Sequence, residues 1–242
     1  IGLKNINDAI NLRSWILQSL ESAIDGSSEK EKKMLTKFVI VGGGPAGVEL
    51  AGALAEFKKY LLRNDYPEIE SSLMKIYLIQ ADNRVLPAMS ERSSEHALKI
   101  LRNLEVDVML NTRVNDYNGS TLVVESINGT EELPAGILIW TAGVRGNAPD
   151  GIDPLILSQG NRIQVNEINQ VKGLNNVFAI GDIALMQTPD YPKGHPMVAQ
   201  VAIQQARNLG KNILSLQRSE NMISEFRYND KGSMAIIGKK DA

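Results

Sequence analysis

The stretch Lys37–Glu56, KFVIVGGGPAGVELAGALAE, decides the fold expected for this chain. It opens with the apolar run Phe38–Val41, whose shortness and β-branched residues predict a buried strand. Three glycines follow at positions 42, 44 and 47, in G-x-G-x-x-G spacing. The Ala-, Leu- and Glu-rich residues from Val48 to Glu56 then predict a helix. A strand, a glycine turn and a helix in this order are typical of the first half of a βαβ unit.

Each glycine of the turn has an expected task. Gly42 permits the tight turn, Gly44 lets a pyrophosphate approach the backbone, and Gly47 lets the helix pack closely on the strand. The N-terminus of the helix adds free N–H groups and the positive end of a dipole. The motif therefore predicts a dinucleotide site, as against a purely structural glycine turn, and its candidate residues are Gly42, Gly43, Gly44, Pro45, Ala46 and Gly47.

Composition excludes several other classes of function. The 242 residues are 43% hydrophobic, which is enough for one large domain or two small ones. A net charge of −2 provides no broad basic surface, so no nucleic-acid partner is expected. With no cysteine, the sequence holds no disulfide, thiolate metal ligand or thiol nucleophile. The two histidines, His96 and His195, are far apart in the sequence, so no metal site is expected either.

The two ends of the sequence predict a piece of a longer protein. The sequence begins with Ile1 and not with a methionine, and Ala242 closely follows an apolar run, Met234–Gly238. No apolar run reaches the about 18 residues that a membrane-spanning helix needs, so we expect the piece itself to be soluble.

The rest of the chain predicts further α/β elements. In the first part we expect a helix over 8–23 capped by Asp8, a loop over 25–33, the glycine-turn helix continuing to Leu62, a short helix around 68–73, strands at 76–79, 106–110 and 136–140, a helix over 90–103, and a hairpin of 122–127 and 131–133 with its turn at Asn128-Gly129. After Pro149 we expect strands at 163–165 and 177–180, a helix over 198–216, and a hairpin of 226–228 and 234–237.

Residues at the ends of the predicted parallel strands are candidate cofactor ligands. Gln80 ends the second strand, where such folds usually keep an acid for the ribose hydroxyls. A glutamine can bond a hydroxyl but carries no charge, so we expect weak discrimination between NADH and NADPH. The alternative is a surface glutamine at a strand end. Thr112–Arg113 and Thr141–Ala142–Gly143 follow two other strands of the same sheet and complete this group.

Four motifs in fixed order carry a resemblance to a known family. They are VGGGPAGVELAG (41–52), WTAGVRGN (140–147), NVFAIGD (176–182) and AQVAIQQARNLGKNI (199–213). With them the sequence resembles the FAD-dependent pyridine nucleotide-disulfide oxidoreductases, which have two dinucleotide-binding domains, and within these the type II NADH dehydrogenases. The last motif is the more family-specific one. The resemblance covers essentially the whole chain.

The resemblance implies an α/β fold in which a Rossmann-like NAD(P)H domain, a parallel sheet with a β-meander, is inserted in a partial FAD domain. Residues 1–33 would be a linker helix of the FAD domain, 34–144 the NAD(P)H domain, 145–225 the second half of the FAD domain, and 226–242 the start of a C-terminal module. The first half of the FAD domain, with its own glycine motif, would lie upstream of this sequence.

The resemblance also implies roles for single residues. Gly181 and Asp182 would bind the ribityl chain of FAD, and Ala199 and Gln200 would begin the helix that points at the flavin pyrimidine ring. Gln200 and Gln204 would line a quinone pocket, unless they are polar residues of a solvated helix face. Glu49 would lie near nicotinamide and flavin, unless it is an ordinary acid of a first helical turn. Glu49 and Gln200 are thus the candidate catalytic residues, whereas His195 is expected to be a loop histidine.

The implied activity is an electron relay that does not pump protons. NADH, or NADPH as the alternative donor, would give a hydride to FAD, and two electrons would then pass to a membrane quinone. The implied location is peripheral, on the cytoplasmic side of the cell membrane, through a C-terminal segment outside this sequence, with a homodimer as one candidate assembly. Two alternatives stay open: a disulfide reductase or sulfide:quinone oxidoreductase of the same superfamily, and a nucleotide-binding flavoprotein scaffold without turnover.

Overall fold

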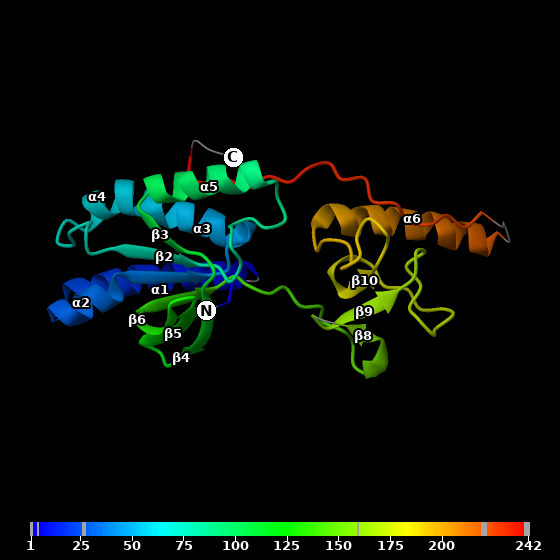
Figure 1. Cartoon of the computed structure of the whole chain (residues 1–242), viewed down its shortest axis with the longest axis horizontal. Helices are drawn as coiled ribbons and strands as arrows, with labels where there is room; N and C mark the ends of the chain where they lie inside the picture. The colour runs from blue at the N-terminus through cyan, green and yellow to red at the C-terminus, as the bar shows by residue number, and fades with distance from the viewer. Residues whose placement is uncertain (1, 4, 26–27, 159, 219–221, 240–242) are drawn as a thin grey trace. The chain divides into compact units, whose positions relative to one another are not determined.

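The computed structural model describes the chain except residues 1, 4, 26–27, 159, 219–221 and 240–242. The chain forms two compact units (Figure 1). The first unit contains Ile1–Ala142 and Ser233–Ala242, and the second contains Gly143–Gly232.

A four-stranded parallel sheet is the centre of the first unit. Its strands are β1 (Lys37–Val41), β2 (Lys75–Ile79), β3 (Val106–Met109) and β7 (Ile137–Trp140), in the order β3-β2-β1-β7. Phe38 of β1 is in register with Ile76 of β2 and with Ile137 of β7. Strand β1 is paired on both edges, and its apolar side chains are buried on both faces of the sheet, as its continuous apolar sequence predicts.

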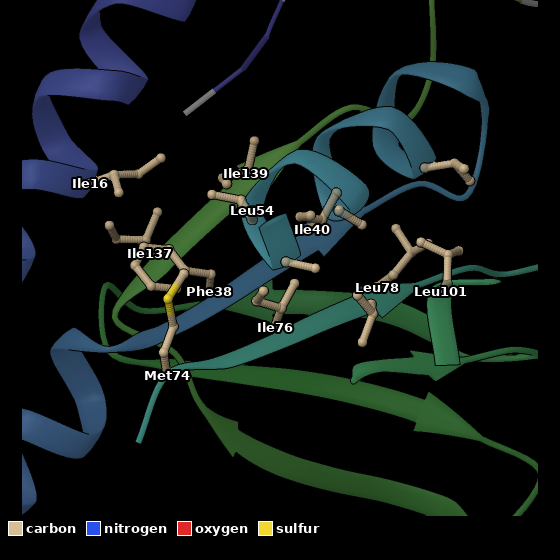
Figure 2. Packing of buried hydrophobic residues seen from close by; sticks show 14 of the residues in the cluster. Ile16, Phe38, Ile40, Leu54, Met74, Ile76, Leu78, Leu101, Ile137 and Ile139 are labelled. Atoms are coloured by element: carbon tan, nitrogen blue, oxygen red, sulfur yellow. The ribbon is translucent and has the colours of Figure 1, made fainter. Parts of the chain in front are cut away.

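Helices cover one face of this sheet. Phe38 and Ile40 point to the side where α1 (Ile6–Ile24), α3 (Pro45–Glu56) and α5 (Glu91–Asn103) pack. Figure 2 shows Ile16, Leu54 and Leu101 of these helices gathered around the strand residues. The side chains alternate along β1, so Val39 and Val41 face the opposite side.

An antiparallel β-meander covers that opposite side. It consists of β4 (Arg113–Tyr117), β5 (Thr121–Ser126) and β6 (Gly129–Pro134), and Leu122 and Val124 of β5 pack on the sheet. The first unit therefore has three layers, which confirms the expected Rossmann-like α/β fold with a parallel sheet and a meander. The hairpin turn was expected at Asn128-Gly129 but consists of Ile127 and Asn128, because Gly129 already pairs with Ser126.

Capping boxes begin two helices at places that the sequence reasoning did not expect. Asn5, not Asp8, caps α1: the two residues form a reciprocal capping box with Asp8 at the third helical position. The expected loop over 25–33 contains the start of α2 (Glu29–Leu35), which Ser28 and Glu31 cap in the same way. The charged composition suggested a loop, whereas the S-x-x-E spacing there is a helix-start signal.

The helix that follows the glycine turn is longer than expected. After α3 it continues as a π-helix, η1 (Phe57–Leu62), and as α4 (Arg63–Asp65), so it ends three residues beyond the expected Leu62. The short helix expected around 68–73 is wrong: these residues form turns, with Ile69 N–H bonding Tyr66 and Leu73 N–H bonding Glu70.

The second unit is built around a small mixed sheet and one long helix. The sheet has the order β10-β9-β8, with β8 (Leu157–Ser158), β9 (Arg162–Val165) and β10 (Ala184–Met186). Strands β9 and β10 are parallel, and β8 and β9 are antiparallel. Two 3-10 turns, η2 (Pro154–Ile156) and η3 (Gly181–Ile183), and the helix α6 (Ala199–Gln217) complete the unit.

Two expected elements of the later chain are wrong. The strand expected at 177–180 is reduced to one isolated bridge between Phe178 and Gln170, and the Asn169 side chain donates a hydrogen bond to the Ala179 carbonyl there. The hairpin of 226–228 and 234–237 does not form, because the two segments belong to different units. Their backbones have other partners: the Phe226 N–H donates to the Glu167 carbonyl, and the Ile236 N–H donates to the Glu49 carboxylate of α3.

Candidate functional site

The glycine turn between β1 and α3 has the backbone that its spacing predicts. Gly42 has φ +113°, and a Cβ there would lie 2.8 Å from the Ala142 backbone nitrogen. Its N–H donates to the Ile79 carbonyl at 2.8 Å, which joins the turn to the end of β2. Both the positive φ and the close approach require glycine at this position.

Gly47 and Gly44 have contrasting surroundings. A Cβ on Gly47 would collide with the carbonyl oxygen of Gly42. By contrast, no atom lies within 4 Å of a Cβ placed on Gly44, the N-cap residue of α3. No side chain caps this helix start, and Pro45 occupies its first turn. The open backbone at Gly44 and the uncapped helix N-terminus together form a place where a phosphate group fits.

The ends of the neighbouring strands close around this turn. The Thr141 hydroxyl donates to the carbonyl oxygens of Val41 and Gly42, at 2.9 and 3.1 Å. Thr112 is buried, and its N–H donates to the Gln80 carbonyl at 3.0 Å. Since the carboxyl ends of parallel strands meet at one edge of a sheet, the structure brings together the glycine turn, Gln80, Thr112, Thr141 and Ala142, as the sequence predicted.

Gln80 contacts the turn itself. Its side chain is 8% exposed, and its Oε1 accepts the Gly43 N–H at 2.7 Å. Its Nε2 donates to Oδ2 of Asp82 at 2.8 Å. Both ends of the Gln80 amide thus have protein partners, and the Asp82 carboxylate, which the sequence reasoning did not single out, lies next to it. The aspartate at the third position after β2 was the available signal in the sequence.

Glu49 lies on the exposed side of α3, where a distant part of the chain contacts it. Its Oε1 accepts the Ile236 N–H at 3.2 Å. Seven residues further along the helix, Glu56 accepts the Lys239 N–H at 2.7 Å. Between them, a Cβ on Gly52 would lie 2.9 Å from the Gly238 nitrogen. Two carboxylates and a glycine on one helix face therefore hold the segment 233–239 against α3.

The second unit gathers the other predicted cofactor residues around the start of α6. Gly181 has φ +70°, its N–H donates to Gln205 Oε1 at 2.7 Å, and a Cβ there would lie 3.2 Å from the Ala202 Cβ. Asp182 is exposed on the same turn. Val198, the N-cap of α6, provides no side-chain cap, so the N–H groups at Ala199 and Gln200 begin an uncapped helix end. Sequence reasoning singled out Gln204 of the Gln204-Gln205 pair and missed Gln205, which is 1% exposed.

Four amide side chains at every fourth position of α6 form a row that we call the amide ladder: Gln200, Gln204, Asn208 and Asn212. Gln204 bonds both the N–H and the carbonyl of Asn229, at 3.0 and 2.9 Å. Gln200 accepts the Lys231 N–H at 3.3 Å and donates to the Gly232 carbonyl at 3.0 Å.

The other end of the ladder holds Ser224. Asn208 and Asn212 both donate to the Ser224 carbonyl, at 3.0 and 2.9 Å, and Asn212 also accepts its N–H at 3.0 Å. The ladder therefore binds the backbone of segment 224–232 along α6. The two glutamines predicted to line a quinone pocket are engaged in this contact, which differs from a solvated helix face.

His195 lies in the loop between β10 and α6, as the sequence suggested, but its side chain is buried. It is 3% exposed and stacks among Tyr191, Phe226 and Tyr228, with ring centroids 4.4, 5.3 and 6.0 Å away. Among the described residues, neither of its ring nitrogens has a hydrogen-bond partner. Burial, and then the positive charge of Arg162, lower its pKa below the ordinary value. The imidazole is thus held neutral.

Three further predicted residues have surroundings that leave their implied roles untested. Arg113 is exposed at the start of β4, and its backbone is in register with Glu125 of the antiparallel strand β5. Gly143, with φ +73°, begins the second unit. Glu49 is four residues past the Pro45 start of α3, and its carboxylate bonds the segment 233–239. None of these positions tests the roles that the resemblance implies.

The structure is that of an α/β protein with a Rossmann-like unit and a glycine turn, and the comparisons give its family. Residues 13–206 match the family model of the pyridine nucleotide-disulphide oxidoreductases. The chain belongs to that family.

Its relatives point to one branch. The type II NADH:quinone oxidoreductase Ndh of Mycobacterium tuberculosis is 32% identical over 248 residues, which cover 100% of this chain and 52% of that protein. The type II NADH:quinone oxidoreductase of Haemophilus influenzae is 34% identical over 234 residues, covering 93% of this chain and 51% of that protein. This chain spans about half the length of these curated relatives.

A solved structure has the same fold. NDH2 from Plasmodium falciparum in complex with NADH superposes with a TM-score of 0.85 at 24% identity, covering 98% of this chain and 63% of that one. The resemblance stated from the motifs is therefore confirmed at the level of family, fold and relatives.

Proposed function

We propose that this chain is part of a type II NADH:quinone oxidoreductase and that its first unit binds NADH. The observation that carries the proposal is the glycine turn, which has an open backbone at Gly44 beside an uncapped helix start. The relatives named as NADH:quinone oxidoreductases over the whole chain support the reaction class.

The proposed domain organisation follows the resemblance. Residues 34–144 form the NAD(P)H domain, 1–33 and 145–225 belong to the FAD domain, and 226–242 begin a C-terminal module. The division of the chain near residue 142 supports a boundary there. The assignment of the last segment is open to test, since 226–232 group with the second unit and 233–242 with the first.

In the proposed NADH site, the pyrophosphate lies at Gly44 and the N-terminus of α3. The N–H groups of that helix start, together with its dipole, favour the negative charge of the phosphates. The Thr141 hydroxyl supports the turn by bonding the Val41 and Gly42 carbonyls. Glu49, whose carboxylate is oriented by the Ile236 N–H, positions the nicotinamide end.

The residues of the second unit fit the proposed flavin. Asp182 offers an exposed carboxylate for the ribityl hydroxyls, on a turn whose Gly181 N–H is fixed by Gln205. The uncapped start of α6 at Ala199 and Gln200 favours negative charge on the pyrimidine side of the ring. Bound there, FAD would supply the two-electron redox chemistry between NADH and a quinone. The protein would contribute binding, orientation and exclusion of water.

The quinone side of the proposal rests on α6. Gln200 and Gln204 would line the quinone pocket through the segment 229–232 that they hold. The complete enzyme would be peripheral on the cytoplasmic side of the membrane, and a homodimer is the proposed assembly. Among the described helices, none has the length and apolar character needed to cross a bilayer.

The test is an anaerobic titration of the protein at its natural length, purified with its flavin. NADH is expected to bleach the flavin absorbance, and a soluble quinone analogue is expected to restore it. Bleaching without recovery by any quinone, together with fast turnover of a disulfide, would instead identify a disulfide reductase. Binding of NADH without bleaching would favour the non-catalytic scaffold.

A further inference from the structure

The side chain of Gln80, at the position usually expected to recognise the ribose, has both of its polar atoms bonded within the protein. Gln80 is buried, its Oε1 accepts the Gly43 N–H at 2.7 Å, and its Nε2 donates to Asp82 at 2.8 Å. The next residues of the loop complete the contact, since the Leu86 N–H donates to the Gly43 carbonyl at 2.7 Å. Both polar groups of the Gly43 backbone thus bond the loop after β2. Gln80 fixes the position of the glycine turn.

Asp82 has the properties that Gln80 lacks. It is exposed, it is charged, and it lies three residues after the end of β2, at the sheet edge where dinucleotide folds keep the acid that bonds the ribose hydroxyls. Its backbone is held there, because its carbonyl accepts the Asn111 N–H at 2.9 Å. An ionised carboxylate accepts several hydrogen bonds, so the one from Gln80 leaves room for a hydroxyl donor.

The cation of the same loop, Arg84, is bonded further along the loop. The Arg84 guanidinium donates to the Pro87 carbonyl at 2.8 Å. A 2′-phosphate placed beside Gln80 would lie next to the Asp82 carboxylate, and two negative groups at such range repel each other.

We propose that Asp82, oriented by Gln80, bonds the adenosine ribose and makes this site select NADH over NADPH. The inference rests on the proposed function and replaces the weak discrimination expected from an uncharged Gln80. The acid thus lies two positions later than the usual place at Gln80, and Gln80 is its positioning residue.

The experiment measures the dissociation constants of NADH and NADPH by calorimetry for the 242-residue chain. The wild type is expected to prefer NADH by about ten-fold or more, and Asp82→Asn to remove most of that preference by strengthening NADPH binding. Asp65→Asn removes the same charge at the far end of the helix that starts at the glycine turn, and is expected to leave the ratio unchanged. Gln80→Leu is expected to weaken both ligands alike, because it releases the turn.

Two results would overturn the inference, and they are distinguishable from failure of the proposed function. A wild type that binds NADH without preference contradicts it. So does an Asp82→Asn variant that still folds by circular dichroism, binds NADH and keeps the wild-type ratio. If neither dinucleotide binds the wild type, the dinucleotide site itself is refuted, and the assignment of Asp82 falls with it.

Discussion

At the scale of single residues, Gly47 and Gly44 belong to one motif but have opposite surroundings. The Gly47 Cα faces the Gly42 carbonyl, whereas the Gly44 Cα faces open space. Gly47→Ala is therefore expected to lower the free energy of unfolding by about 1–3 kcal/mol, as overpacking does. Gly44→Ala is expected to leave stability nearly unchanged and to weaken NADH binding, because the methyl group occupies the place of the pyrophosphate.

Urea unfolding and NADH titration of both variants check this prediction. The account fails at this residue pair if Gly44→Ala unfolds the first unit, or if it binds NADH as tightly as the wild type.

His195 predicts a pH dependence with a definite sign. Burial and the charge of Arg162 lower the pKa of His195 in the folded chain. Below the ordinary pKa of about 6.5, the unfolded state therefore binds a proton more readily than the folded state does. The stability contributed by this group is complete at neutral pH and is lost as the pH falls towards the lowered pKa. His195→Phe keeps a ring among Tyr191, Phe226 and Tyr228 and is expected to remove this loss.

The measurement compares urea midpoints of the wild type and His195→Phe at neutral and at mildly acid pH. As the pH falls, the urea midpoint of His195→Phe is expected to rise relative to that of the wild type. A difference between the two proteins that does not change with pH would contradict a neutral, buried His195.

At the scale of elements, the amide ladder of α6 predicts that alanine substitutions along it lower the stability by different amounts. Asn212 is 2% exposed and bonds the N–H, carbonyl and hydroxyl of Ser224. Asn212→Ala removes a buried side chain and leaves the Ser224 N–H without this partner, so it is expected to destabilise by about 1–3 kcal/mol. Asn208 bonds the same serine from a more accessible position, so Asn208→Ala is the matched control, with an expected loss below about 1 kcal/mol.

Thermal unfolding followed by circular dichroism ranks the two variants. An Asn208→Ala loss equal to or above that of Asn212→Ala would show that burial does not set the strength of the ladder.

Helix α3 offers a second test at this scale. Gly52→Ala places a methyl group 2.9 Å from the Gly238 nitrogen, so it is expected to displace the segment 233–239. The Ile236 and Lys239 amides, which donate to Glu49 and Glu56, should then exchange with deuterium faster. Gly210→Ala on α6, where the added methyl meets open space, is the control and is expected to stabilise by about 0.5–1 kcal/mol.

Unchanged exchange at both amides in Gly52→Ala would mean that the segment does not depend on this close approach. A loss of stability in Gly210→Ala would point to an interaction of that helix face which the structure does not contain.

At the scale of the whole molecule, the sequence predicted what depends on local patterns. The buried strands expected at 38–41 and 76–79 and the glycine turn followed from apolar runs and glycine spacing, and the structure confirms them as β1, β2 and the turn after β1. The segment 224–239 could not be predicted in this way. Its apolar stretches suggested a hairpin, but the ladder of α6 and the carboxylates of α3 compete for its backbone N–H and carbonyl groups. Such contacts join residues far apart in sequence and leave no short-range pattern.

The candidate site shows the same limit. The glycines and Thr141 were predictable, because their tasks follow from strand order and spacing. The pairing of Gln80 with Gly43 and Asp82 was not, since it depends on which way a side chain turns at a strand end.

The central claim is that the first unit binds NADH at the glycine turn, and amide chemical shifts of the ¹⁵N-labelled chain test it most directly. NADH added up to about millimolar concentration, the upper range of enzyme substrate affinities, is expected to shift the amides of Gly43, Ala46, Gly47 and Asp82. The amides of β8 to β10 in the second unit are expected to keep their positions. Shifts confined to residues 143–232, or no shifts at all, would contradict the claim.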